Sequence, residues 1–208
     1  MKHLLLHTCC APCSLLPLEA FSQQGYVVTA AYINPNIHPY TEYSRRLATF
    51  EEYARLKGIA VQQEPYNAEE WEEVVGIHGG PYPLVNNEID YEHKLFNKQT
   101  RCRQCYRLRF EKTSDMAHRW GIESLSTSLT ISPYQFTSII FEELTAAADC
   151  YKLNALCVDF RDSYPESVKR SRAMGMYRQN YCGCRFSIEE ADMERAALQK
   201  MRSGSAHG

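Results

Sequence analysis

The stretch Leu4-Leu5-Leu6-His7-Thr8-Cys9-Cys10-Ala11-Pro12-Cys13 joins a short apolar run to a group of cysteines. Three consecutive leucines are typical of a strand that is buried on both faces of a parallel sheet. A helix is expected over residues 15–21, where apolar side chains recur at helical spacing. The cysteines therefore fall in the turn between a strand and a helix, which is where open α/β sheets bind their ligands.

Four further apolar segments have the character of strands, and helix-compatible stretches separate them. The expected strands are residues 27–33, 59–61, 124–129 and 154–160. Helix starts are indicated by Ser132 followed by Pro133, and by the Ser-x-x-Glu pattern at Ser163 and Ser187. This alternation predicts a single α/β domain over residues 1–202, with a mostly parallel sheet flanked by helices. Residues 203–208 are expected to form a flexible tail.

The composition excludes several classes of protein. The chain has 208 residues and a formal net charge of −2, which excludes a uniformly basic nucleic-acid binder but not a local basic patch. No stretch approaches the roughly 18–20 consecutive apolar residues of a membrane helix. The segment before His7 is too short for the apolar region of a signal peptide. A soluble cytoplasmic protein without a membrane partner is therefore predicted.

Nine cysteines are present, and seven of them fall in three tight groups. The groups are Cys9, Cys10 and Cys13; Cys102 and Cys105; and Cys182 and Cys184. Clustered cysteines in the cytoplasm indicate metal or redox chemistry, because thiols are kept reduced there. Cys157 stands outside these groups in the apolar run 154–160, and we expect it to be a small core residue.

The first two groups together provide a set of metal ligands. Residues three apart share one side of a helical turn, so Cys102 and Cys105 can ligate one metal centre together. With Cys9 and Cys10 they make four thiolates, which suit either a structural zinc ion or an iron–sulfur cluster. Spacing alone leaves both possibilities open, although adjacent cysteines fit a cluster more easily than a single tetrahedral ion.

The third group predicts redox chemistry. Gly183 between Cys182 and Cys184 permits the tight backbone that a small-ring disulfide requires. Such a bond is strained and easily reduced, so a catalytic dithiol/disulfide pair is predicted, with two free thiols or metal ligands as the alternative. The run Cys10 to Cys13 also resembles the C-x-P-C of thioredoxin, which keeps a thiol oxidoreductase as an alternative function.

Basic residues gather around the second and third groups. Residues 98–112 carry six basic side chains and one acidic one, and residues 163–185 carry five and one. Contact with RNA phosphates follows as a hypothesis, because Arg and Lys are the usual phosphate ligands. The expected phosphate contacts are Arg101, Arg103, Lys169 and Arg170. The aromatic residues that could stack on a base are Tyr106, Tyr177 and Tyr181. An RNA-binding module stapled by zinc is therefore a second alternative.

Four motifs together resemble the QueH-type epoxyqueuosine reductase family, from Leu4 to about Ser187. They are residues 7–14 (HTCCAPCS), the C-x-x-C at Cys102, residues 128–134 (SLTISPY) and residues 181–184 (YCGC). The strand–cysteine–helix opening is also similar to the nucleotide-binding end of adenine-nucleotide α-hydrolase-like (Rossmann-like) folds. Cysteines stand here in place of a phosphate-binding loop, so ATP binding is not implied.

The resemblance implies an iron–sulfur oxidoreductase that removes the epoxide oxygen of epoxyqueuosine at the wobble position of a tRNA anticodon, the last step of queuosine formation. It implies a [4Fe–4S] cluster on Cys9, Cys10, Cys102 and Cys105, a redox-active disulfide between Cys182 and Cys184, and an additional iron contacted by Cys13. The implied partners are this tRNA and an electron donor. The proton donor stays open among His7, Tyr181 and Asp162.

Overall fold

The structure, a computed structural model, describes residues 1–79, 84–85, 88–89 and 91–192. The expected tail at 203–208 and the last ten residues of the expected domain lie outside the described residues. No helix within the described ranges is both long enough and apolar enough to cross a membrane.

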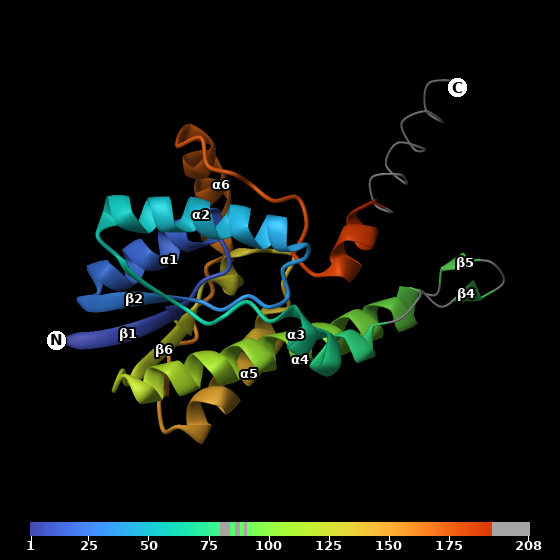
Figure 1. Ribbon diagram of the computed structural model, residues 1–208, viewed down its shortest axis with the longest axis horizontal. Helices are drawn as coiled ribbons and strands as arrows, with labels where there is room; N and C mark the ends of the chain where they lie inside the picture. The colour runs from blue at the N-terminus through green and yellow to red at the C-terminus, as the bar shows by residue number, and fades with distance from the viewer. Residues whose placement is uncertain (80–83, 86–87, 90, 193–208) are drawn as a thin grey trace.

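Five parallel strands form the central sheet, in the order β3–β2–β1–β6–β7 (Figure 1). The strands are β1 (Lys2–His7), β2 (Tyr26–Tyr32), β3 (Ala60–Gln63), β6 (Ser124–Thr127) and β7 (Asn154–Ala155). The central strand β1 pairs Leu4 with Val28 of β2 on one side and with Ser124 of β6 on the other. The chain first extends the sheet toward β3 and then crosses to β6, so the topological switch point lies at the carboxyl ends of β1 and β6. The expected α/β fold with a mostly parallel sheet is confirmed.

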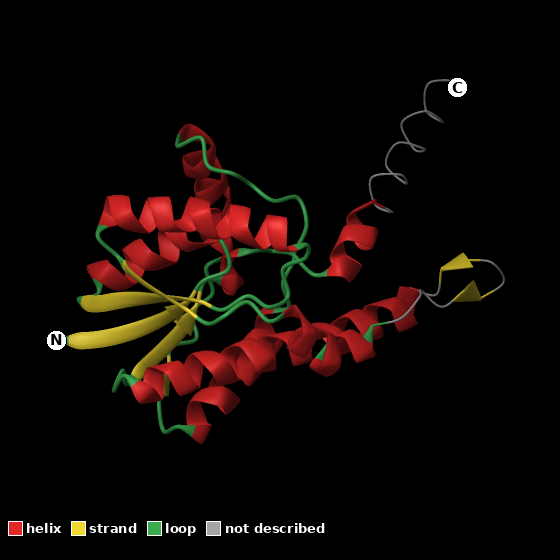
Figure 2. Cartoon of the chain, viewed as in Figure 1, coloured by secondary structure: helices red, strands yellow, loops and turns green. Residues whose placement is uncertain are grey.

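Helices cover both faces of the sheet (Figure 2). One face carries α1 (Ala11–Gln23), α2 (Tyr40–Lys57) and α6 (Tyr164–Ala173), and the other carries α4 (Tyr91–Arg119) and α5 (Thr137–Cys150). Alternate leucines of β1 serve the two layers, because Leu5 packs with Phe110 while Leu4 and Leu6 pack with Leu15. All three leucines are fully buried, which stabilises the fold by about 2 kcal/mol each.

Smaller elements complete the chain outside the main sheet. They are α3 (Ala68–Val74), which packs on α4, the 3₁₀ turns η1 (Gly76–His78), η2 (Leu129–Ile131) and η3 (Arg161–Ser163), and the antiparallel pair β4 (Leu84–Val85) and β5 (Glu88–Ile89). Residues 185–192 are also helical.

Two local expectations are wrong. The strand expected over 154–160 ends at Ala155, because the hydroxyl groups of Ser126 and Thr130 take the next carbonyl groups at Leu156 and Val158. Cys157 is consequently exposed instead of lying in the core. The helix expected after Ser132 begins only at Thr137, because the Ser132 hydroxyl accepts the N–H of Tyr134 and closes a turn instead.

Candidate functional site

Cys10 begins helix α1 at the carboxyl end of β1. Its backbone is extended (φ −171°), and its sulfur accepts the N–H of Cys13 at 3.4 Å, in the role that a Ser or Asp oxygen usually has at a helix N-terminus. Pro12 lies in the first turn, where its missing N–H costs no hydrogen bond. The local sequence thus fixes the Cys10 sulfur at the ligand-binding edge of the sheet.

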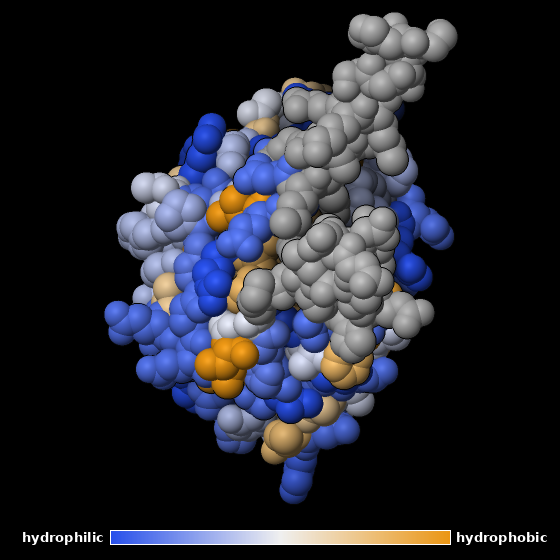
Figure 3. Space-filling view, turned by 90° about the vertical axis from the view of Figure 1, so that its right-hand side faces the viewer, coloured by the Kyte–Doolittle hydropathy of each residue, from blue (hydrophilic) through white to orange (hydrophobic). Residues whose placement is uncertain are grey.

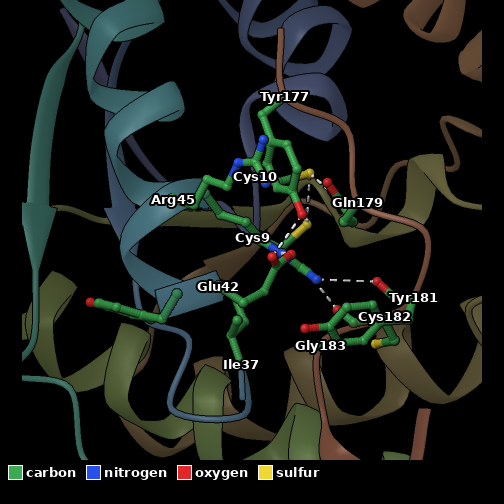
Figure 4. Close-up of polar contacts among 12 residues, drawn as sticks. Cys9, Cys10, Ile37, Glu42, Arg45, Tyr177, Gln179, Tyr181, Cys182 and Gly183 are labelled. Carbon is green, nitrogen blue, oxygen red and sulfur yellow. Dashed lines mark hydrogen bonds and ion pairs between the residues drawn. The ribbon is translucent and has the colours of Figure 1, made fainter. Parts of the chain in front are cut away.

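Three sulfur atoms cluster at this edge. The Sγ atoms of Cys9, Cys10 and Cys13 all lie within 4.8 Å of one another, with 3.8 Å between Cys9 and Cys10. The side-chain amide of Gln179 donates to Cys10 Sγ at 3.0 Å (Figure 4). These three thiols lie close enough to bind a metal ion together, and thiolate sulfur suits zinc as well as iron–sulfur clusters.

Protonation in this cluster is uneven. Burial opposes ionisation of Cys10, but hydrogen bonds from Cys13, Cys9 and Gln179 hold its pKa well below the ordinary value. The hydrogen bond to Cys10 raises the pKa of Cys9 to about 12, and hydrogen bonds to Cys10 and Cys9 also raise that of Cys13. The cluster therefore holds its first negative charge on Cys10.

The C-x-x-C pair lies on α4 and meets the C-x-C segment. Cys105 and Cys184 share a small buried cluster with Trp71, whose indole N–H donates to Cys105 Sγ at 3.4 Å. Burial raises the pKa of Cys102 and of Cys105, and it raises that of Cys184 to about 12. Negative charge on Cys182 acts in the same direction on all three, so the two motifs lie within electrostatic reach of each other.

A buried arginine links the two groups of cysteines. Arg109 on α4 is 1% exposed and donates to Asn34 Oδ1 at 2.6 Å and to the carbonyl of Ile33 at 3.4 Å. Its charge acts on both Cys9 and Cys105, where it favours the thiolate. Arg109 thus tethers α4 to the end of β2 and supplies positive charge between the first loop and the C-x-x-C.

The backbone of the C-x-C segment is held from several sides. Arg46 of α2 donates to the carbonyl groups of Cys182 at 2.8 Å and Tyr181 at 3.3 Å, and Glu42 accepts from it at 2.7 Å. Figure 4 labels Glu42, Tyr181 and Cys182, the partners of Arg46 in this network. At Gly183, the carbonyl accepts the N–H of His38 at 2.8 Å.

Glycine is required between the two cysteines. Gly183 has a φ of +138°, and a Cβ there would lie 3.0 Å from Ile37 Cγ1. Both flanking cysteines are free thiols in this structure, with Cys182 exposed and Cys184 buried. Gln135 donates to Cys182 Sγ at 3.5 Å. One thiol of the pair is therefore accessible, while its partner lies inside.

We expect Arg46→Ala to loosen this segment. The change removes one partner of a buried ion pair and strips two carbonyl groups of their donor, which costs about 3–5 kcal/mol of unfolding free energy. Cys182 should also react faster with an alkylating reagent. Urea unfolding and timed alkylation with mass spectrometry measure both effects.

Arg45→Ala is the matched control for this prediction. Arg45 is the exposed neighbour of Arg46 and lies 3.8 Å above the Tyr177 ring, so its loss should cost less than about 1 kcal/mol. Equal stability and equal Cys182 reactivity in Arg46→Ala and Arg45→Ala would contradict the role given to Arg46.

The basic residues singled out in the sequence differ in their surroundings. Arg101 is 6% exposed and paired with Glu190 at 2.7 Å, and Arg103 pairs with Glu143 at 2.6 Å. A further pair joins Arg170 to Glu19 across α6 and α1. Lys169, whose side chain is 80% exposed, makes only a long ion pair with Glu166, at 3.9 Å. The charges of Arg101, Arg103 and Arg170 are therefore paired within the chain.

The aromatic residues singled out for stacking are also engaged. Tyr106 is 2% exposed and packs on Phe110, so the expectation that it stacks on a base is wrong. The hydroxyl groups of Tyr177 and Tyr181 donate to Glu42 and to the carbonyl of His38, both at 2.7 Å.

His7 does not suit the role of catalytic acid, because its ring is neutral and its one N–H is already donated to a backbone carbonyl. It is fully buried, and burial together with the charge of Arg109 holds its pKa well below the usual value. Because the carbonyl of Ile33 can only accept, His7 Nε2 carries the proton of the neutral ring and donates there, while Nδ1 accepts from Thr127. Tyr181 and Asp162 stay as candidates for the proton donor.

The sequence did not predict the site contacts of four residues: Arg46, Trp71, Arg109 and Gln179. Arg109 offered one signal, since it follows Cys105 by four positions and therefore shares its face of α4. Gln179 offered none, because it reaches Cys10 from 169 positions away.

The fold and the site define a class: a Rossmann-like α/β protein whose switch-point loop carries thiols in place of a phosphate-binding loop. Residues 4–190 match the family Epoxyqueuosine reductase QueH. The chain is 30% identical to the epoxyqueuosine reductase QueH of Dehalococcoides mccartyi, covering 90% of this chain and 93% of that protein. It is also 30% identical to that of Thermotoga maritima, covering 97% and 98%. This chain belongs to the epoxyqueuosine reductase QueH family.

A solved structure supports the fold independently. The predicted subunit of tRNA methyltransferase from Methanocaldococcus jannaschii superposes with a TM-score of 0.53 at 12% identity, over 83% of this chain and 76% of that one. At this level of identity the similarity bears on the fold alone.

Proposed function

We propose that this chain is an iron–sulfur-dependent oxidoreductase that converts epoxyqueuosine in tRNA to queuosine, the reaction for which its family is named. The observation that carries the proposal is the placement of the cysteines. A cluster of three thiols lies at the switch point, and the pair with one accessible thiol meets the C-x-x-C on α4, where Cys184 shares a buried cluster with Cys105. The proposed location is the cytoplasm, where thiols stay reduced.

The proposed cofactor is a [4Fe–4S] cluster held by Cys9, Cys10, Cys102 and Cys105, with Cys13 contacting an additional iron. The donor set fits such a group, because Cys10 Sγ receives N–H donors from Cys13 and Gln179 and Cys105 Sγ receives one from Trp71. Such donors favour thiolates and tune cluster potentials. When bound, a cluster supplies single-electron transfer and Lewis-acidic iron. The residues of the chain bind it and keep its surroundings positive through Arg109 and Arg46.

The reaction must balance two electrons and two protons. Both C–O bonds of the epoxide break, a C=C bond forms and the oxygen leaves as water. Cys182 and Cys184 can supply both electrons and both protons when their S–H bonds break and an S–S bond forms between them. An external electron donor must then reduce this disulfide before the next turnover.

An anaerobic assay tests the proposal directly. Purified protein is incubated with tRNA that contains epoxyqueuosine and a chemical reductant, and nucleosides are analysed by mass spectrometry. Conversion to queuosine, with iron and sulfide in the protein, is the expected result. Zinc without iron and no conversion would instead support a zinc-stapled RNA-binding module, and disulfide reduction in protein substrates would support a thiol oxidoreductase.

The proposed tRNA contacts are Arg101, Arg103, Lys169 and Arg170. Replacing all four with Gln should make tRNA affinity fall less steeply with salt, because each lost phosphate contact lowers the logarithmic slope by roughly 0.7–0.9. Lys169→Gln alone should already show this effect, since the Lys169 side chain is 80% exposed and its ion pair with Glu166 is long, at 3.9 Å. Affinity measured over a salt series gives the slope.

The control for this series is Lys57→Gln, an exposed cation at the end of α2. Its slope should equal that of the unchanged protein, and iron content should be unchanged in Lys169→Gln. An unaltered slope in the fourfold variant would count against the patch as a tRNA site.

A further inference from the structure

One aromatic side chain stands exposed beside the C-x-C segment. Tyr134 is 76% exposed, more than Phe96, Tyr40 or Trp120, the other exposed aromatic side chains of the described residues. The next residue, Gln135, donates to Cys182 Sγ at 3.5 Å. Tyr134 therefore lies one position from a direct contact with the accessible thiol.

The exposure of Tyr134 does not come from a loosely held backbone. Its N–H donates to the Ser132 hydroxyl at 3.3 Å, and the N–H of Gln135 donates to the Ser132 carbonyl at 3.2 Å. The buried Tyr106 hydroxyl donates to Gln135 Oε1 at 2.7 Å and accepts the N–H of Phe136 at 3.4 Å. The turn thus presents Tyr134 to solvent on a fixed support.

A second ring stands at right angles to the first. Tyr164, at the start of α6, has its ring centroid 6.3 Å from that of Tyr134, with 86° between the planes. Negative charge on Cys13 and Cys10 helps to raise the pKa of Tyr164, after the larger effect of burial. Tyr164 consequently lies within electrostatic reach of the thiol cluster, while Tyr134 precedes the residue that contacts Cys182.

The pair leaves an aromatic face uncovered. A perpendicular neighbour covers at most one face of Tyr134, and an exposure of 76% leaves the rest to water. Proteins recognise single-stranded RNA loops by stacking splayed-out bases on such aromatic rings. A ring on a backbone that is already fixed loses little conformational entropy when a base stacks on it. Figure 3 views the face at the carboxyl ends of the strands, and outside the grey atoms it is mainly hydrophilic, as nucleic-acid interfaces are.

We infer that Tyr134, supported by Tyr164, is a stacking surface for a base of the tRNA anticodon loop that neighbours the modified nucleotide. The inference rests on the proposed function and adds a binding residue to it. Stacking on an uncharged ring can contribute to RNA binding even though Arg101, Arg103 and Arg170 are already paired within the chain.

The test compares RNA affinity among variants of the full chain. The probe is a synthetic anticodon stem-loop RNA, bound anaerobically and followed by fluorescence anisotropy. Tyr134→Ala should weaken binding about tenfold, as loss of one stacked base predicts, without changing the salt slope. Tyr134→Phe and Tyr134→Trp keep a flat ring and should bind within about twofold of the unchanged protein.

Trp120→Ala provides the matched control. Trp120 is 46% exposed and lies just before β6, at the opposite end of the strands from the site, so its loss should leave affinity unchanged. A fluorescent 2-aminopurine base in the loop adds a second readout, since stacking on Tyr134 should quench it and Tyr134→Ala should restore its emission.

The outcomes separate this inference from the proposed function. If the unchanged protein converts epoxyqueuosine but Tyr134→Ala binds the stem-loop equally well, the stacking surface is refuted while the function stands. Recovery by Phe and Trp but not by Ala supports stacking. If the unchanged protein converts no epoxyqueuosine in tRNA, the proposed function fails and the inference that rests on it fails too.

Discussion

Cys10→Ser is expected to lower the iron and sulfide content of the anaerobically purified protein by roughly tenfold or more. Cys10 is the cysteine of its cluster that ionises first, because Cys13, Cys9 and Gln179 all stabilise its thiolate. A hydroxyl at this position cannot supply a soft anionic ligand. Iron and labile sulfide analysis, together with the absorption of thiolate–iron bonds, measures the loss.

Companion variants decide which other cysteines belong to the ligand set. Cys102→Ser and Cys105→Ser should lose iron and sulfide as Cys10→Ser does. Full retention in either one would refute the four-ligand assignment. Loss of iron with sulfide retained in Cys13→Ser would assign that thiol to the additional iron. Cys157→Ser is the control, since that thiol is exposed and contacts Thr145 rather than the site.

Local sequence was enough to place the first thiols. The apolar run before His7 can only satisfy burial on both faces as a central strand, and Pro12 suits the first turn of a helix, so the cysteines between them had to lie at a sheet edge. The i,i+3 spacing of Cys102 and Cys105 placed them on one side of α4 for the same local reason.

Partners that are distant in sequence could not be predicted in this way. Arg46 reaches the carbonyl of Cys182 across 136 positions, and nothing in residues 40–57 distinguishes it from the exposed Arg45. Charge counting also could not predict which cations have an acidic partner in the fold. Arg101 belongs to a basic segment, yet the fold brings Glu190 to it and buries the pair.

Capping patterns failed where a side chain had a competing partner. The Ser187 hydroxyl accepts the N–H of Gly183 and donates to the carbonyl of Cys184, so it fixes the C-x-C segment and does not cap a helix that begins at Ser187. The pattern correctly indicated a helix nearby, because residues 185–192 are helical. What it could not show is that the hydroxyl is occupied by the C-x-C segment.

Within that segment, Cys182→Ser and Cys184→Ser should each abolish multiple-turnover activity. Iron content and tRNA affinity should stay within about twofold of the unchanged protein. With one sulfur missing, no disulfide can form inside the segment, so the two electrons and two protons of each turnover have no dithiol source. Cys157→Ser, which leaves the pair intact, should turn over normally.

The oxidation state of the pair can be followed directly by alkylation and mass measurement. Before substrate, the exposed Cys182 should alkylate first and the buried Cys184, with its pKa near 12, much more slowly unless the protein is denatured. After substrate without reductant, denatured samples should show two fewer free thiols, both within residues 182–184. Gly183 has a backbone shape (φ +138°) that a side chain would obstruct, and His38, Arg46 and Ser187 hold the surrounding backbone. If both thiols stay fully alkylatable throughout turnover, or if either Ser variant cycles at the normal rate, electrons reach the epoxide without this pair and its redox role is refuted.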